Sequence, residues 1–98
     1  MEFTWDEQKN RANQKKHGIS FETAILVFDD PLNVSAQDRE VDGEARWQTI
    51  GMVNGIHVLL VAHTLEVDLD QDDDEEVIRI LSARKATRRE RRIYAQGI

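Results

Sequence analysis

The spacing of apolar residues changes at Pro31, and this change limits which folds the chain can adopt. Before it, Phe21, Ala24 and Phe28 recur at helical spacing, and Ser20 is a suitable N-cap. After it, apolar and polar residues alternate with a period of two, which is typical of strands. Because proline cannot continue helical hydrogen bonds, we expect the helix to end just before it. Helices and strands therefore occupy separate stretches, which indicates an α+β fold.

Four strands are expected in the second part of the chain. They cover residues 32–36, 46–53, 56–64 and 77–83, with a loop over 38–44. Asn54-Gly55 stands between two apolar runs, and both residues tolerate positive φ, so we expect a tight hairpin turn there. The third strand is apolar on both faces, which favours a central position. The strands should form one antiparallel sheet.

Helices are expected at both ends of the chain. Asp6 is a candidate N-cap for a polar surface helix over 7–17, which Gly18 would end. Thr87 and Glu90 have the spacing of a capping box and predict a last helix over 88–96. Together with the helix after Ser20, this gives two N-terminal helices, a four-stranded antiparallel sheet and a C-terminal helix. We expect one domain, residues 1–98.

Charge is segregated along the chain, although the net charge is −6. Residues 66–76 hold eight acidic residues and no basic one, whereas 77–98 hold seven basic residues against Glu90 alone. The basic block could bind RNA phosphates or an acidic partner, or be a solvated helix face. The acidic stretch is expected to be a mobile loop inserted between strands. It lacks the glycine of a calcium loop, so no metal is expected there.

Targeting signals and redox chemistry point to the cytoplasm. The chain has no cysteine, which excludes disulfides and thiolate metal sites. No apolar run approaches the roughly 18 residues of a membrane span, so no membrane association is expected. Glu2 and Asp6 stand where a signal peptide would be apolar.

Short motifs distributed over nearly the whole chain resemble those of the BrnT toxins. In order they are Phe3-x-Trp5-Asp6-x-x-Lys9, Lys16-His17-Gly18, Phe21-Glu22-x-Ala24, Asp30-Pro31, Asp42-Gly43-Glu44-x-Arg46, His63-Thr64, Arg79-Ile80-x-Ser82-Ala83-Arg84, Arg89-Glu90-Arg91 and Tyr94. No single motif is diagnostic, but the ordered set is specific.

This resemblance implies a RelE-like fold, a curved antiparallel sheet flanked by helices. It also implies a metal-independent endoribonuclease without a cofactor, which arrests translation. A BrnA-like antitoxin with a ribbon-helix-helix region would neutralise it and contact the operator DNA of the pair. In place of the arginine that commonly follows His63-Thr64 in the family, this chain has the acidic stretch. The alternative function is therefore a non-catalytic co-repressor that only binds antitoxin.

Proton transfer and phosphate binding need a base, an acid and cations. His63 ends the central strand, and the ordinary pKa of histidine suits proton transfer; a hydrogen-bonded structural role is the alternative. Arg79 alternates with Ile78 and Ile80, so we expect it to share a surface with His63 on the neighbouring strand.

A phosphate site is expected where the last strand meets the last helix. Arg84 and Lys85 precede a helix N-terminus, which favours anions, although either could instead anchor the antitoxin. The fork of arginine favours Arg84 as a catalytic cation beside His63 and Arg79, with Lys85, Arg46 and Arg88 as further RNA contacts. His17 is assigned to the end of the first helix rather than to catalysis. We expect His63 and Arg84 to be replaceable without loss of the fold.

Overall fold

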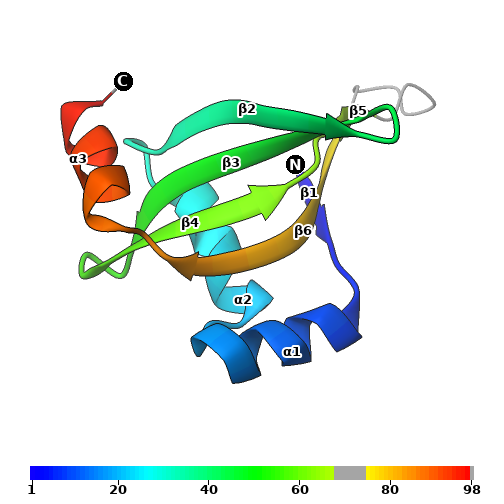
Figure 1. The fold of residues 1–98 in the computed structure, drawn as a ribbon, viewed down its shortest axis with the longest axis horizontal. Helices are drawn as coiled ribbons and strands as arrows, with labels where there is room; N and C mark the ends of the chain where they lie inside the picture. Colours follow the sequence, from blue (N-terminus) through cyan, green and yellow to red (C-terminus); the bar gives the residue numbers. More distant parts are fainter. Residues whose placement is uncertain (68–74, 98) are drawn as a thin grey trace.

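The computed structural model describes residues 1–67 and 75–97 (Figure 1). Its elements are β1 (Glu2–Thr4), α1 (Glu7–His17), α2 (Phe21–Ala24), the 3-10 helix η1 (Ile25–Asp29), β2 (Val34–Val41), β3 (Glu44–Val53), β4 (His57–His63), β5 (Glu66–Val67), β6 (Glu76–Lys85) and α3 (Arg88–Gln96). None of the helices in this described part is long and apolar enough to cross a membrane.

The sheet is mixed and larger than expected. Its strands lie in the order β1-β6-β4-β3-β2, and β5 pairs separately with β6. The antiparallel pairings of β2, β3, β4 and β6 confirm the four expected strands. The prediction of a purely antiparallel sheet is wrong, because β1 pairs with β6 in parallel. The sequence pattern does not reveal β1, because a strand of three residues is too short to show a period. Its Phe3 packs on Phe28, with 5.3 Å between ring centroids, and this contact joins residues far apart in the sequence.

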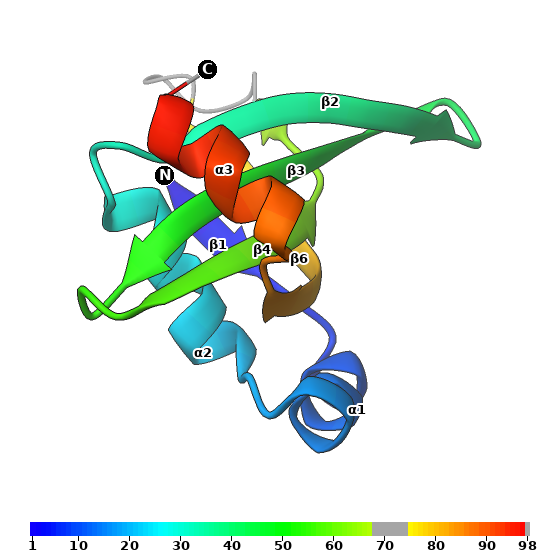
Figure 2. The same ribbon diagram turned by 60° about the vertical axis from the view of Figure 1, so that its left-hand side comes forward.

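Two tight turns connect β2, β3 and β4. Asn54 and Gly55 have φ of 56° and 68°, which confirms the expected hairpin. Asp42 and Gly43 have φ of 51° and 80° and form a second turn, so the loop expected over 38–44 is wrong. Asp-Gly has the same turn chemistry as Asn-Gly, but the charged residues before it conceal the strand pattern. The β2–β3 hairpin extends beyond the other elements (Figure 2).

The ends of the acidic stretch belong to the sheet. Glu66 and Val67 form β5 and pair with Val77 and Glu76 of β6, so the loop expected over all of 66–76 is shorter than predicted. The expectations of mobility and of no bound metal fall on residues 68–74, which lie outside the described residues.

The expected helix ends are confirmed. Asp6 caps α1 by accepting hydrogen bonds from the amides of Gln8 and Lys9, and Gly18 ends the helix with φ of 72°. Thr87 and Glu90 form the capping box of α3. The helix that begins after Ser20 is α2, which continues as the 3-10 helix η1. A 3-10 helix has three residues per turn, so Val27 lies on the same side as Ala24 and is buried.

Buried asparagines hold the polar helix α1 in place. The Asn13 amide donates to the carbonyl of Ala83 at 2.8 Å and accepts from the amide of Ala83 at 3.1 Å. The Asn13 side chain thus forms with β6 the pair of hydrogen bonds that the backbone of a neighbouring strand would form. Asn10 accepts from the amide of Phe21 at 2.8 Å. A helix without an apolar face is therefore docked by side-chain amides, which periodicity does not reveal.

The two faces of the sheet have different cover. We call the face under α1, α2 and η1 the inner face, where Phe21, Val27, Val61 and Ile80 form part of the core. A Cβ at Gly51 would lie 2.8 Å from the Cβ of Val27, so glycine permits this close approach of η1. The opposite, outer face is crossed by α3 at one end (Figure 2).

Candidate functional site

His63 lies on the inner face and is buried, with 3% of its surface exposed. Its Nδ1 lies 3.0 Å from the carbonyl oxygen of Thr64, and its Nε2 lies 2.7 Å from Oγ1 of Thr49. A carbonyl only accepts, so Nδ1 carries the hydrogen and the neutral ring accepts at Nε2. Thr49 is in turn 2.6 Å from the hydroxyl of Ser35. Both ring nitrogens are therefore used within the fold.

The surroundings of His63 favour its neutral form. Burial lowers the pKa of the ring, and the hydrogen bond to Thr64 only partly offsets this. The edge of Phe28 packs on the ring, with 5.1 Å between centroids. His63 is thus buried and hydrogen-bonded, which agrees with the structural alternative that the sequence left open.

Arg79 does not share a surface with His63, and this expectation was wrong. His63 is paired with Ile80, so Ile80 shares its face and Arg79 points to the outer face. The pairing shifts between Ala62 and His63, which leaves Leu81 as an extra residue on β6. Alternation along one strand gave the correct partition of β6, but it carried no information about the register with β4.

On the outer face, two arginines converge on Glu44. Arg79 donates to Oε1 of Glu44 at 2.7 Å, and the Arg46 guanidinium lies 3.5 Å from the same oxygen. The side chains of Arg79, Arg46 and Glu44 are 44%, 28% and 32% exposed, so an external ligand can reach them. Two cations share one anion, which leaves this centre with a net positive charge. We call these three residues the Glu44 centre.

The hydrogen-bonding capacity of the Glu44 centre is incompletely used. The Nε atoms of Arg46 and Arg79 are buried and have no partner among the described residues. A buried donor without a partner is costly, so these two Nε–H groups would gain from a further acceptor. A groove of about 180 Å³ lies beside it and is lined by Asp38, Arg39, Val41, Arg46, Trp47, Ala62, Leu81 and Ser82. Sequence reasoning included Arg46 and Arg79 but missed Glu44, although its motif was noted.

Arg84 also faces outward, but its charge is already paired. Its two terminal nitrogens donate to the two carboxylate oxygens of Glu90 at 2.7 and 2.9 Å. These bonds are the main reason why the pKa of Glu90 is lowered to about 2 and that of Arg84 is raised. Glu90 also accepts from the amide of Thr87 at 2.8 Å, within the capping box. The phosphate site expected here is thus occupied by a side chain of α3.

The remaining sequence candidates lie at the ends of helices and strands. Lys85 and Arg88 are exposed at the end of β6 and the start of α3. His17 lies in the last turn of α1 with Lys15 and Lys16, where positive charge favourably meets the helix dipole. No group of three or more side chains suited to a metal ion occurs in the part of the chain that the structure describes.

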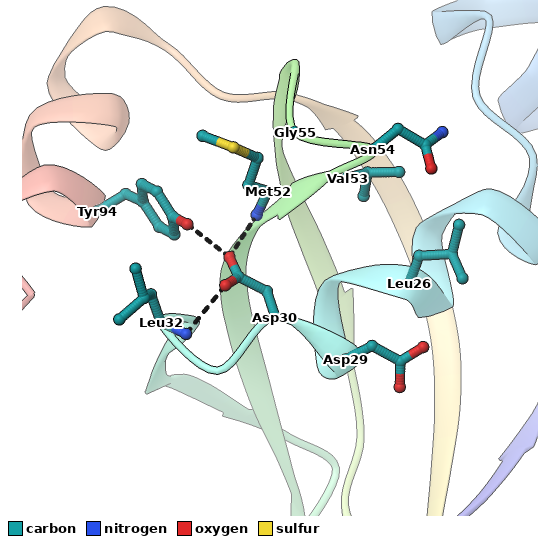
Figure 3. A pocket seen from close by; sticks show the side chains of 9 residues that line it. All are labelled: Leu26, Asp29, Asp30, Leu32, Met52, Val53, Asn54, Gly55 and Tyr94. Atoms are coloured by element: carbon teal, nitrogen blue, oxygen red, sulfur yellow. Dashed lines mark hydrogen bonds between the residues drawn. The ribbon is translucent and has the colours of Figure 1, made fainter.

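Asp30 anchors α3 at the far end of the sheet (Figure 3). It accepts hydrogen bonds from the Tyr94 hydroxyl at 2.6 Å, the Met52 amide at 2.8 Å and the Leu32 amide at 2.9 Å. Burial alone would raise the pKa of Asp30, but these bonds outweigh it and lower the pKa. The adjoining pocket of about 410 Å³ is lined largely by apolar side chains and holds no cationic one. It therefore does not suit a phosphate.

Comparisons with known proteins identify a family and a similar fold. Residues 5–90 match the family model described as the ribonuclease toxin, BrnT, of type II toxin–antitoxin systems. The fold is similar to the 1.1 Å crystal structure of the Brucella abortus ribonuclease toxin BrnT. That match has a TM-score of 0.61 and 28% sequence identity, and it covers 90% of this chain and 99% of the other. No curated protein matches the chain in sequence.

Proposed function

The chain belongs to the BrnT family of ribonuclease toxins of type II toxin–antitoxin systems, and from this we propose that it cleaves RNA on the outer face of its sheet. The proposed reaction is a metal-independent endonucleolytic cleavage that arrests translation. The observation that carries the proposal is the Glu44 centre, where Arg79 and Arg46 share a single carboxylate. Its surplus positive charge can stabilise the negative charge that develops on a phosphate under attack.

Further cations extend this surface along β6. Arg84 lies five residues from Arg79, about 16 Å along a strand, and Arg88 follows at the start of α3. Lys85 is paired with Leu59 of the core and faces the inner side, so it does not belong to this surface. We propose that Arg84 and Arg88 contact flanking phosphates of a bound RNA and hold the strand over the Glu44 centre. Arg84 can do so only by exchanging part of its bonding to Glu90, so its contribution is smaller than that of Arg79.

His63 has a different proposed role from the one expected. Its ring connects β4 to Thr49 on β3, and it packs under Phe28 of η1. We assign it to maintaining the sheet that presents the arginines, and not to proton transfer with RNA.

The proposed partners are those of a type II pair. A BrnA-like antitoxin with a ribbon-helix-helix region would bind the toxin in the cytoplasm and contact operator DNA, so the toxin reaches DNA only through it. The alternative, a co-repressor without cleavage activity, is favoured by one observation: Arg84, the expected phosphate ligand, is paired with Glu90.

An expression experiment distinguishes RNA cleavage from co-repression without cleavage. The chain is expressed alone and with a co-expressed antitoxin while growth is followed and RNA 5′ ends are mapped. We expect growth arrest and new RNA ends for the chain alone, and neither for a folded Arg79→Ala variant. A parent chain that cleaves no RNA while it binds antitoxin would establish the co-repressor.

A further inference from the structure

We propose that Glu44 is the general base of the cleavage, an inference that rests on the proposed RNA cleavage at the outer face. Cleavage within an RNA strand begins when the 2′-hydroxyl loses its proton and attacks the adjacent phosphorus. A carboxylate fixed beside phosphate-binding cations is placed to take that proton. The Glu44 centre combines both groups within hydrogen-bonding distance.

The position of Glu44 is fixed by its surroundings. It begins β3 immediately after the tight turn at Gly43, on the outer face of the sheet. Arg79 and Arg46 both contact Oε1, at 2.7 and 3.5 Å. No described residue bonds the second oxygen, Oε2, and about a third of the side chain is exposed, 32%. One oxygen is therefore held by the cations while the other is available to a substrate.

The other candidate bases near this face are already committed. His63 is buried on the inner face and uses both ring nitrogens within the fold. Glu90 is bonded by Arg84 and Thr87, and a pKa of about 2 makes it a weak proton acceptor. Glu44 is the carboxylate that combines exposure with two adjacent arginines among the described residues.

The step balances with water as the only co-reactant. Oε2 of Glu44 takes the proton of the 2′-hydroxyl, the 2′-oxygen bonds to phosphorus, and the bond from phosphorus to the 5′-oxygen breaks. The 5′-oxygen takes a proton from water, and Glu44 returns its proton to the solvent. The products are a 2′,3′-cyclic phosphate and a 5′-hydroxyl. Arg79 and Arg46 stabilise the extra negative charge of the intermediate.

The decisive variant is Glu44→Gln, because glutamine can still accept the hydrogen bond from Arg79 but cannot take a proton. We expect its single-turnover cleavage of a short RNA to be slower by a factor of about 10² to 10⁴. Its affinity for the same RNA, measured by fluorescence anisotropy, should be equal or higher, since a negative charge is removed. On the acid side, the parent rate should rise about tenfold per pH unit, and the variant should lose this dependence.

Glu40→Gln is the matched control, because Glu40 is exposed on the same hairpin and forms no ion pair with a described residue. It should cleave at the parent rate. Glu44→Asp keeps a carboxylate and should recover part of the activity, and circular dichroism verifies that each variant is folded.

Two results would overturn the assignment of Glu44. One is a folded Glu44→Gln variant that cleaves within about threefold of the parent. The other is a loss of RNA affinity as large as the loss of cleavage, which would show that Glu44 only positions the arginines. A parent that binds RNA but yields no cleaved ends would instead refute the proposed function, and with it the assignment of Glu44 as the general base.

Discussion

The two faces of this sheet treat their polar side chains in opposite ways. On the inner face, His63 and Asn13 are buried and their polar atoms bond within the fold. On the outer face, Arg79 and Arg46 share one carboxylate and leave buried Nε atoms without partners in the described chain. Satisfied groups stabilise a fold, whereas incompletely satisfied charges retain capacity for a ligand. The proposed function thus falls on the face whose charged groups are incompletely satisfied.

The outer face repeats this contrast on a smaller scale. Arg79 and Arg84 belong to the same strand and face the same side, but Arg84 has a bidentate partner of its own in Glu90. Arg79 shares its carboxylate with Arg46, whereas Arg84 has Glu90 to itself, so the two arginines differ in their partners and not in residue type.

Among the variants that test this comparison of the two faces, the largest expected effect is the loss of cleavage in Arg79→Ala. Removing a donor that stabilises transition-state charge should slow cleavage by a factor of about 10² to 10³. The free energy of unfolding should change by no more than about 0.5 kcal/mol, since the side chain is partly exposed. Arg84→Ala should slow cleavage by less than tenfold. Single-turnover rates and urea denaturation test the pair, and an Arg84 effect equal to that of Arg79 would break the comparison.

The next effect is a loss of stability in His63→Ala. The variant leaves a cavity beneath Phe28 and removes one of the two hydrogen-bond partners of the buried Thr49 hydroxyl. The free energy of unfolding should therefore fall by about 2–4 kcal/mol. The sequence predicts only that His63→Ala stays folded; burial of the ring adds this expected loss of stability. Urea denaturation measures the change, and Arg88→Ala, at an exposed position, is the control. A His63→Ala protein that is as stable as the parent but no longer cleaves RNA would support a catalytic role for His63.

A smaller effect should appear when pH is lowered. The pKa of His63 is below its ordinary 6.5 in the folded chain, so the unfolded chain binds the proton more readily. Its contribution to stability is therefore complete above pH 6.5 and is lost as pH falls toward the folded pKa. Denaturation of the parent and of His63→Gln at pH 7.5 and 5.5 should show a larger decline in the parent. Equal declines would count against a buried neutral ring.

The smallest effect is expected for Glu90→Gln. Without the carboxylate, Arg84 gains a charge free for phosphate, so RNA affinity should rise by less than tenfold. The slope of log affinity against log salt concentration should steepen by about one, which corresponds to one additional phosphate contact. Part of the capping box is lost, at a cost of about 1 kcal/mol in stability. An unchanged salt slope would show that RNA does not extend to Arg84.

Local signals in the sequence located most elements. Asp6, Ser20 and Thr87 were identified as N-caps, and Asn54-Gly55 as a turn, because these depend on neighbouring residues alone. The parallel pairing of β1 joins residues far apart in sequence, so no local pattern reports it.

The candidate site was predicted only in part, for the same reason. Arg79 and Arg46 were identified as candidates, but the irregularity at Leu81 that separates Arg79 from His63 depends on pairing with β4. Glu44 lies 35 residues from Arg79, and only the folded sheet brings them together. Asn13 was overlooked because a polar residue on a polar helix has no periodic signature.

The pairing of β1 with β6 also has a consequence during biosynthesis. Asn13 bonds Ala83 across 70 residues, so the N-terminal segment cannot complete its contacts until β6 has been made. Arg79 arrives with the same strand and completes the Glu44 centre. At about 5–20 residues per second, the 35 residues that separate Glu44 from Arg79 require about 2–7 s of translation. A ribosome that makes this chain therefore holds an unassembled Glu44 centre until Arg79 has been added, and prematurely terminated chains lacking β6 lack Arg79 altogether.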